Sequence, residues 1–212
     1  MLDKKGLRDA YSLNTPEDSI NLYKVWASTY DIDFAQKNDY KSPSEVAKCY
    51  NKYAKTTDDP ILDVGAGTGL IGQSISKTCK REIDAIDIST EMLDFAKSKG
   101  CYTKLIKADL TKKLDIPKDQ YGAIVSSGTF THGHVGPKAF DELLRILKPD
   151  GLFIVTIHSG VFRKGGFEQK LSELKTSITD PIFQEVKAYG NNQDKRYGDD
   201  KVIIAIFRKK TL

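Results

Sequence analysis

A short apolar run that ends in alternating glycines, LDVGAGTGLIG at residues 62–72, constrains the fold more than any other stretch of the chain. A glycine within an element costs roughly 0.5–1 kcal/mol relative to alanine. Gly65, Gly67 and Gly69 alternate directly after the run, which indicates a tight turn at the end of a buried strand. A turn without side chains lets the backbone approach a ligand closely. The stretch therefore predicts a strand, a ligand-binding turn and a helix.

Short apolar runs alternate with helical segments through the rest of the chain. The runs predict five strands, near residues 60–65, 82–88, 102–110, 121–128 and 151–158. Strand–helix alternation is typical of a parallel sheet covered by helices on both faces. The last two runs, FQEVKAYG and KVIIAIFRKK, flank a polar loop and predict an antiparallel hairpin that closes the sheet edge.

The segment before residue 57 has helical spacing instead. One stripe of apolar and aromatic residues consists of Ile20, Tyr23, Ala27, Tyr30 and Phe34. A second helix is predicted to begin with a capping box formed by Ser42, Pro43 and Glu45. We expect residues 1–56 to form a helical lid. Residues 57–212 should form the core of a Rossmann-like, doubly wound α/β domain, so that the whole chain is one compact domain.

Composition excludes several classes of protein. The net charge of +4 is too small to indicate a nucleic-acid-binding protein by itself. The three cysteines, Cys49, Cys79 and Cys101, are odd in number and far apart, as reduced thiols in a cytoplasmic protein would be. No apolar run reaches the length of a membrane span, and the first residues lack the apolar stretch of a signal peptide. We therefore expect a cytoplasmic protein.

Acidic residues follow two of the predicted strands. Asp87 ends the second strand, at the distance of about 20 residues from the glycine turn at which an acid can accept both ribose hydroxyls. Asp109 ends the third strand, where its carboxylate could accept an exocyclic amine of an adenine. A helix-capping or surface role is the plainer alternative for each acid. Their common place at the carboxyl ends of strands favours a nucleoside site.

The motifs LDVGAGTG, IDAIDISTEML, KADL, YGAIVSSGTF and LLRILKPDGLFIVTIH occur in this order between residues 60 and 158. Together they resemble the class I S-adenosylmethionine-dependent methyltransferases. More loosely, YKVWASTYDIDF followed by YKSP resembles the methyltransferase-like subgroup named after the Williams–Beuren syndrome region. The first resemblance covers roughly half of the chain and implies a methyltransferase that uses S-adenosyl-L-methionine and releases S-adenosyl-L-homocysteine.

The resemblance also implies a set of cofactor-binding residues. Gly65, Ala66, Gly67 and Gly69 would form the turn under the methionine part, oriented by Asp63. Asp87 would hold the ribose, and Asp109 would hold the adenine edge. Other expected contacts are the adenine neighbours Ile88, Met92 and Leu110, the strand-end residues Ser127 and Gly128 near the sulfonium, and the lid aromatics Tyr23, Trp26 and Tyr30. Packing onto the sheet is the alternative role of those aromatics.

Three histidines, His132, His134 and His158, end or follow the fourth and fifth predicted strands. Methyl transfer needs a general base only where the acceptor must lose a proton early. His132 and His134 are our candidates for such a catalytic role, with loop histidines that bond backbone as the alternative. No acidic partner is fixed by spacing, so we expect no metal site.

The fourth predicted strand ends in SSGTF, without the Asn/Asp-Pro-Pro-aromatic motif of enzymes that methylate amino groups of nucleic acids, and there is no Pro-Cys pair. We therefore expect a small-molecule acceptor, with neither a nucleic-acid nor a membrane partner. A protein methyltransferase and a non-catalytic S-adenosylmethionine-binding module are the alternatives. A nicotinamide-dependent dehydrogenase shares the sheet and the ribose acid, but the glycine spacing and Asp109 count against it.

Overall fold

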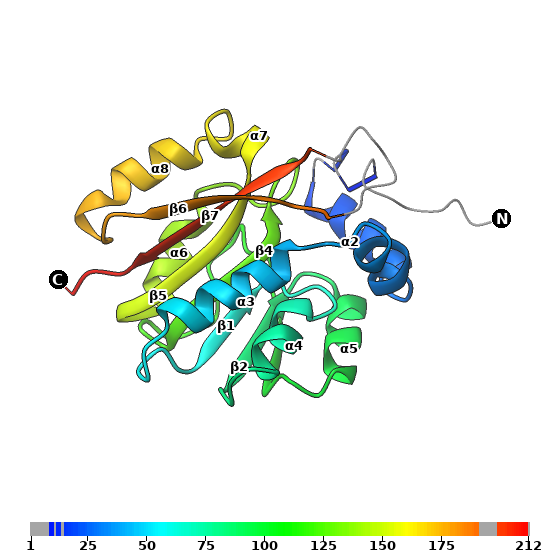
Figure 1. Cartoon of the computed structure of the whole chain (residues 1–212), viewed down its shortest axis with the longest axis horizontal. Helices are drawn as coiled ribbons and strands as arrows, with labels where there is room; N and C mark the ends of the chain where they lie inside the picture. Colours follow the sequence, from blue (N-terminus) through cyan, green and yellow to red (C-terminus); the bar gives the residue numbers. More distant parts are fainter. Residues whose placement is uncertain (1–8, 11, 14, 191–198, 212) are drawn as a thin grey trace.

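The computed structural model describes residues 9–10, 12–13, 15–190 and 199–211. They fold around one seven-stranded sheet with the strand order β3-β2-β1-β4-β5-β7-β6 (Figure 1). Strands β1 to β5 pair in parallel, and β7 pairs antiparallel with both β5 and β6. The doubly wound sheet and the C-terminal antiparallel hairpin are confirmed. Residues 1–8 of the predicted lid and residues 191–198 of the predicted hairpin loop lie outside the described residues.

The helices and strands follow the predicted order. The strands are β1 (Ile61–Val64), β2 (Ile83–Asp87), β3 (Lys104–Lys107), β4 (Tyr121–Phe130), β5 (Leu147–His158), β6 (Ile182–Lys187) and β7 (Lys201–Arg208). The helices are α2 (Pro16–Trp26), η1 (Tyr30–Gln36), α3 (Ser42–Tyr53), α4 (Leu70–Ser76), α5 (Thr90–Ser98), α6 (Ala139–Ile146), α7 (Ser159–Phe162), α8 (Phe167–Glu173) and η2 (Leu174–Thr176). Among the described helices, none is long and apolar enough to cross a membrane.

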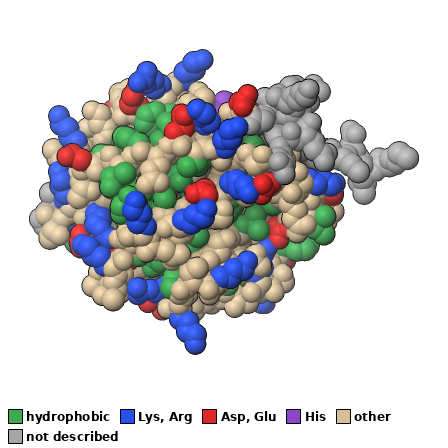
Figure 2. Space-filling view, viewed as in Figure 1, with side chains coloured by type: hydrophobic (Ala, Val, Ile, Leu, Met, Phe, Trp, Pro, Cys, Tyr) green, Lys and Arg blue, Asp and Glu red, His purple; other side chains and the backbone are tan. Residues whose placement is uncertain are grey.

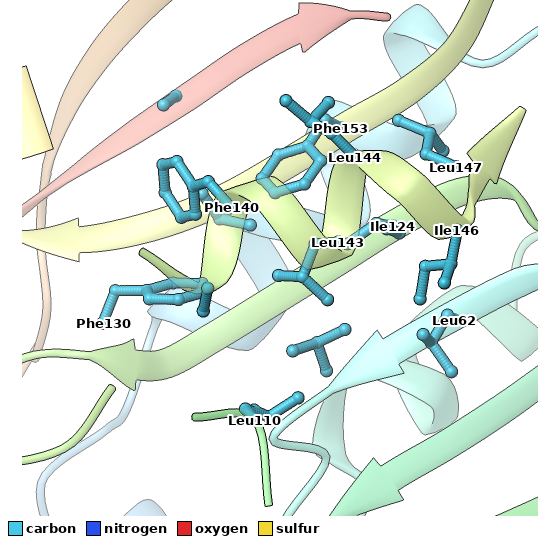
Figure 3. Packing of buried hydrophobic residues seen from close by; sticks show 14 of the residues in the cluster. Leu62, Leu110, Ile124, Phe130, Phe140, Leu143, Leu144, Ile146, Leu147 and Phe153 are labelled. Atoms are coloured by element: carbon cyan, nitrogen blue, oxygen red, sulfur yellow. The ribbon is translucent and has the colours of Figure 1, made fainter. Parts of the chain in front are cut away.

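Side-chain alternation along the strands builds a separate core on each face of the sheet. In β5, Leu152 and Ile154 pack on the face of α3 and α4, whereas Phe153 and Val155 pack on the face of α6. Figure 3 shows the second of these cores, where Phe140 of α6 packs over the face of β4 and β5. Its ring centroid is 5.3 Å from that of Phe153. Burial on both faces explains why these strands read as continuous apolar runs.

The strand order reverses between β1 and β4, which lie side by side at the centre of the sheet. The connections leaving their carboxyl ends therefore diverge to opposite sides, and a crevice opens between them. The glycine turn follows β1 at this crevice. On the other side, the pairing of β4 with β5 is irregular between Ser126 and Phe130, which takes Ser127 and Gly128 out of the regular ladder.

Helix α2 is stabilised at its start by a capping box that the sequence analysis did not identify. The Thr15 hydroxyl accepts a hydrogen bond from the Asp18 N–H at 3.1 Å, and the Asp18 carboxylate accepts one from the Thr15 N–H at 3.0 Å. The capping box predicted at Ser42 is wrong. Lys41 is the N-cap of α3, but its side chain makes no capping hydrogen bond. Glu45 pairs with Lys48 instead. The reciprocal bonds need an N-cap in extended conformation, which Thr15 has and Lys41 lacks.

Helix α3 covers the sheet rather than the crevice (Figure 1). Its buried residues Val46, Ala47 and Tyr50 belong to the core that also contains Ile71 of α4 and Ile154 of β5. The apolar face of α3 is therefore already buried against the sheet, so this helix offers no apolar face to cover the crevice. The remaining candidates for a lid are α2 and the π-helix η1.

The glycine stretch also accommodates a partly buried tyrosine. A Cβ placed on Gly69 would lie 2.7 Å from the Tyr102 ring, and one on Gly72 would lie 2.4 Å from it. The Tyr102 hydroxyl donates to the Asp63 carboxylate at 2.6 Å and accepts from the Gly72 N–H at 3.2 Å. Burial raises the pKa of Asp63 to about 7, and the hydrogen bond from Tyr102 opposes this shift. Two of the four glycines thus make room for a tyrosine that holds a buried carboxyl group.

We predict that Tyr102→Phe destabilises the fold more at pH 8 than at pH 5. The Asp63 carboxyl is mainly protonated at pH 5 and mainly ionised at pH 8, because its pKa in the folded state is about 7. Leaving a buried charged group without its donor costs about 1–3 kcal/mol or more, and a neutral group costs less. Urea unfolding at the two pH values measures the difference.

Tyr53→Phe is the matched control, since the Tyr53 hydroxyl bonds the neutral Gln184 amide at 3.3 Å. Its effect on the free energy of unfolding should be equal at the two pH values. An equal loss at both pH values for Tyr102→Phe would show that the hydroxyl does not hold an ionisable Asp63.

Candidate functional site

A chamber lies at the crevice between β1 and β4, and we call it the first chamber. Its walls come from the glycine turn, the ends of β2 and β4, the segment after β3 and helix α2. The lining residues are Ser19, Tyr23, Tyr30, Gly65, Gly67, Asp87, Ile88, Met92, Asp109, Leu110, Thr111, Ser127, Gly128, Thr129, His134 and Val135. Twelve of the predicted site residues therefore meet here, although they come from distant parts of the chain.

Asp87 lies at the floor of the first chamber and is held by the backbone. Its carboxylate accepts hydrogen bonds from the Gly67 N–H at 2.8 Å and from the Ser89 N–H at 2.9 Å. Burial raises the pKa of Asp87, and these backbone donors oppose the shift. The two bonds fix the orientation of a buried carboxylate that still has lone pairs for further donors.

Asp109 lies nearer the solvent, with 18% of its side chain exposed. Its carboxylate accepts from the Thr111 N–H at 2.9 Å and from the Thr111 hydroxyl at 2.6 Å, and Lys112 lies 3.4 Å away. Burial opposes ionisation, but the Thr111 bonds and the Lys112 charge together lower the pKa of Asp109. One of its oxygens is therefore already occupied by neighbours in the chain.

The backbone at Gly65, Gly67 and Gly128 has positive φ angles of 64°, 54° and 77°. A Cβ on Gly65 would lie 2.0 Å from the Thr129 hydroxyl, and one on Gly128 would lie 2.6 Å from the Tyr40 hydroxyl. A Cβ on Gly67 would meet no described atom within 4 Å. Gly65 and Gly128 thus permit close packing, and Gly67 leaves open space above the turn for a ligand.

The charges of the first chamber favour a cation. Asp87 and Asp109 line it, and no Lys or Arg is among the described residues that do so. A buried charge needs a partner of opposite sign, so the positive sulfonium of S-adenosylmethionine fits better than a pyrophosphate. This arrangement supports the sequence argument against a nicotinamide dinucleotide.

Helix α2 and the π-helix η1 cover the first chamber. Tyr23 and Tyr30 line it, and their ring centroids are 6.3 Å apart. Asp31 of η1 accepts a hydrogen bond from the Thr68 hydroxyl of the glycine turn at 2.5 Å and also pairs with Lys99, which follows α5. The Asp31 carboxylate thereby fastens η1 to the core beside the chamber.

A second chamber adjoins the first on the side of β4 and β5. The two share Tyr23, Tyr30, Gly128 and His134. The second chamber is also lined by Ala10, Trp26, Phe34, Tyr40, Phe130, Thr131, Thr156, His158, Ala188, Tyr189 and Val202. Its walls are mainly aromatic, and they include residues of the C-terminal strands as well as of the N-terminal helices.

His134 lies at the boundary between the chambers and has a defined tautomer. Its Nδ1 is 2.8 Å from the His132 carbonyl oxygen, which can only accept, so Nδ1 carries the proton. Nε2 is 2.9 Å from the Tyr23 hydroxyl, which therefore donates to it. Burial lowers the pKa of His134, and the bond to the His132 carbonyl opposes this shift. His134 is consequently neutral near pH 7.

Several predicted site residues lie away from the first chamber. Asp63 is fully buried behind the turn, Gly69 packs on Tyr102, and Ala66 faces a separate small recess beside Tyr40. Trp26 lines only the second chamber, and His132 lines neither chamber. The His132 ring instead contacts the His158 ring at 4.7 Å. Among the described residues, no three metal-ligating side chains gather as a metal site.

The sequence analysis missed other lining residues of the first chamber, namely Ser19, Thr111, Thr129 and Val135. It also missed Tyr40, whose hydroxyl lies 3.0 Å from the Ser127 hydroxyl. Thr111 could have been found, because it follows Asp109 in the same motif. Tyr40 and Ser19 carry no local signal, since only the packing of the N-terminal segment brings them to the ends of the strands.

The fold and the site together define a Rossmann-like domain with a nucleoside-type chamber at its switch point. Comparison with known families agrees, since residues 62–155 match the family described as "Methyltransferase domain". Residues 62–155 therefore form a methyltransferase domain, and the motif order and the fold of the chain are those of the class I S-adenosylmethionine-dependent methyltransferases. The looser resemblance to the Williams–Beuren subgroup stays a prediction.

Individual relatives support the assignment to this family. The human protein "Methyltransferase-like protein 27" is 28% identical over 71% of this chain and 62% of its own length. "Malonyl-[acyl-carrier protein] O-methyltransferase 2" of Ilyobacter polytropus is 32% identical over 66% of this chain and 53% of its own length. The chain thus spans less than two thirds of these relatives.

A solved structure shows the same fold over the whole chain. It is that of an S-adenosyl-L-methionine-dependent methyltransferase of Methanococcus maripaludis, and it covers 100% of this chain and 98% of its own. The TM-score is 0.61 and the sequence identity is 17%. At this identity the likeness concerns the fold alone.

We predict that Asp87→Asn weakens binding of S-adenosylhomocysteine more than Asp109→Asn does. Asp87 is buried and fixed by two backbone donors, so its charge faces the ligand without screening by solvent. Hydrogen bonds to a charged group contribute about 1.5–3 kcal/mol, which corresponds to roughly 10- to 150-fold in affinity. Asp109→Asn should cost less than about tenfold, because Thr111 and Lys112 already engage that carboxylate. Calorimetric titration measures both, with thermal unfolding as a check of folding. The reverse order would contradict the assignment of Asp87 to the ribose.

Proposed function

We propose that this chain is an enzyme that transfers a methyl group from S-adenosylmethionine to a small-molecule acceptor by in-line displacement. One observation carries the proposal: a chamber lined by two carboxylates, with no Lys or Arg among the described residues of its lining, adjoins a mainly aromatic chamber at the ends of β4 and β5. Such a pair of chambers can hold a cationic methyl donor and a compact acceptor side by side. Alignment of the two reactants can by itself supply several kcal/mol of barrier reduction, about 7–11 in favourable cases.

The residues of the first chamber fit the cofactor. Asp87 would accept the ribose hydroxyls, and Asp109 with Leu110 would bind the adenine edge. Ile88 and Met92 would pack against the adenine ring. S-adenosylmethionine supplies an electrophilic methyl group on its sulfonium when bound. The chain's own part is to orient the donor and acceptor and to exclude water.

The remaining lining residues complete the donor site. Gly65 and Gly67 would lie under the methionine part, where Gly67 leaves open space. Ser127 and Gly128 lie at the irregular end of β4 and line the first chamber, and Gly128 also lines the second. The sulfonium end of the donor would therefore point toward the acceptor.

The second chamber supports a small acceptor. Its walls come from both ends of the chain as well as from β4 and β5, and most of its lining side chains are buried. Figure 2 shows Lys and Arg side chains scattered over one face with Asp and Glu between them, rather than a basic track for nucleic acid. Three free cysteines, Cys49, Cys79 and Cys101, support a cytoplasmic location.

A methyl-labelled cofactor tests the proposed function. The chain is incubated with it and with a cell extract separated into small-molecule and protein fractions, and mass spectrometry locates the label. We expect label in the small-molecule fraction, and Asp87→Asn should greatly reduce it. Label on protein alone would replace our proposal with a protein methyltransferase. Cofactor binding without any transfer would indicate a non-catalytic binding module.

We also predict that residues 16–41 close over the cofactor as a lid, with Asp31 as its fastening. Hydrogen exchange in this segment should slow when S-adenosylhomocysteine binds, because closure excludes water from the first chamber. Asp31→Asn should weaken the bond to Thr68 and the pairing with Lys99, so exchange in η1 should rise without ligand. Asp33→Asn is the matched control, since Asp33 pairs with Lys37 at the C-terminal end of η1. Equal exchange in both variants would contradict the fastening by Asp31.

A further inference from the structure

The second chamber has a wall chemistry that selects its occupant. Seven Phe, Tyr and Trp side chains line it, those of Tyr23, Trp26, Tyr30, Phe34, Tyr40, Phe130 and Tyr189. No Lys, Arg, Asp or Glu is among the described residues that line it. A carboxylate, phosphate or ammonium group placed here would lose its hydration without gaining an ionic partner, which is costly. An uncharged, planar molecule can instead pack against the rings.

The hydrogen bond between Tyr23 and His134 lies where the two chambers meet, because both residues line both chambers. Nε2 of His134 accepts the Tyr23 proton at 2.9 Å. The Tyr23 oxygen therefore keeps its lone pairs for a further donor. A hydroxyl group of a molecule in the second chamber can supply that donor, next to the place where the methyl group would arrive.

We infer that the second chamber binds a compact, uncharged, planar acceptor with a phenol-type hydroxyl group, whose proton passes through Tyr23 to His134. The inference rests on the proposed methyl transfer and specifies its acceptor. Phenol-type hydroxyls suit this site better than aliphatic ones. A neutral histidine is a weak base, and a weak base removes a proton more readily from the more acidic hydroxyl.

The proton and the bonds balance in this step. An oxygen–carbon bond forms between the acceptor and the methyl group while the sulfur–carbon bond breaks, and that electron pair stays on sulfur. The acceptor proton moves to the Tyr23 oxygen as the Tyr23 proton moves to Nε2. The resulting imidazolium keeps its Nδ1–H bond to the His132 carbonyl at 2.8 Å. The positive charge thus passes from sulfur to His134.

The titratable groups around this pair come from several elements. The His132 side chain disfavours charge on His134, and the Asp87 carboxylate acts on Tyr23 from across the first chamber. The Tyr40 and Tyr30 hydroxyls also face Tyr23. At the far wall, His158 lies 3.7 Å from Asp200. His158 is the other histidine that lines the second chamber, so a test has to separate it from His134.

Three compact para-methyl aromatic probes of similar size test the wall chemistry. The full chain is titrated calorimetrically with 4-methylphenol, 4-methylbenzoate and 4-methylbenzylamine, with and without saturating S-adenosylhomocysteine. We expect the neutral phenol to bind at least about tenfold more tightly than either charged probe. Equal or tighter binding of the benzoate or the benzylamine, or no binding of the phenol, would overturn the inference.

The two proposals fail separately in this experiment. If S-adenosylhomocysteine does not bind but the phenol does, the proposed function is wrong and the chamber assignment stands. If S-adenosylhomocysteine binds but the charged probes bind as tightly as the phenol, the acceptor assignment is wrong and the cofactor site stands.

The pH dependence of phenol binding tests the proton path. Protonation of His134 turns Nε2 into a donor, so Tyr23 can no longer donate to it. The Nε2–H group then donates to the Tyr23 oxygen and competes with the incoming hydroxyl for that acceptor. The affinity for 4-methylphenol should therefore fall about two- to tenfold as the pH drops below the ordinary histidine range. His134→Gln should remove this dependence, with His134→Asn as a second variant if the first does not fold.

His158→Gln is the matched control, since it removes the other histidine of the same chamber. It should keep the pH dependence of the wild-type chain. A dependence that disappears in His158→Gln and remains in His134→Gln would overturn the proposed proton path. Circular dichroism of each variant confirms that it is folded before the titrations are compared.

Discussion

The reversal of strand order between β1 and β4 is the constraint on which the rest of the structure depends. Because the chain leaves these neighbouring strands in opposite directions, no element of the sheet can fill the space beyond their carboxyl ends. The turn after β1 has to pass close to β4, and at Gly65 only hydrogen fits beside the Thr129 hydroxyl. The pairing of β4 with β5 is irregular near the end of β4, and this irregularity places Ser127 and Gly128 at the same crevice. One topological feature thus produces both chambers.

Buried charge divides the site into two regions. Asp87 and Asp109 face the first chamber, and the second chamber has aromatic and histidine walls. A carboxylate that is held by backbone donors, as Asp87 is, keeps its orientation without a cation beside it. The lining of the first chamber thus favours a positive ligand, while that of the second offers no ionic partner to a charged one. The proposed methyl transfer from a sulfonium would use this combination, because the donor carries the charge and the reacting atoms have to be shielded from water.

In the N-terminal segment, the local sequence predicts where the helices form, whereas tertiary packing decides what each helix covers. The TPED sequence encodes the capping box that begins α2, and the aromatic stripe gives this helix an apolar face. Neither signal says what that face covers. The segment 42–53 has equally good helical spacing, yet its apolar face packs on the sheet as α3. The two segments differ because α3 packs on the apolar face of the sheet next to α4, whereas the Asp31 carboxylate holds η1 beside the glycine turn.

The sequence alone determined the order of strands and helices, the doubly wound class and the positions of Gly67, Asp87 and Asp109, because these depend on local periodicity and on motifs that lie within residues 62–110. Only the tertiary structure decided that Gly69 and Gly72 make room for Tyr102, that Asp63 is buried behind the turn, and that Tyr23 donates to His134. Those contacts join residues 30 to 111 positions apart. Sequence spacing carries no information about such pairs, since they exist only after both faces of the sheet have been covered.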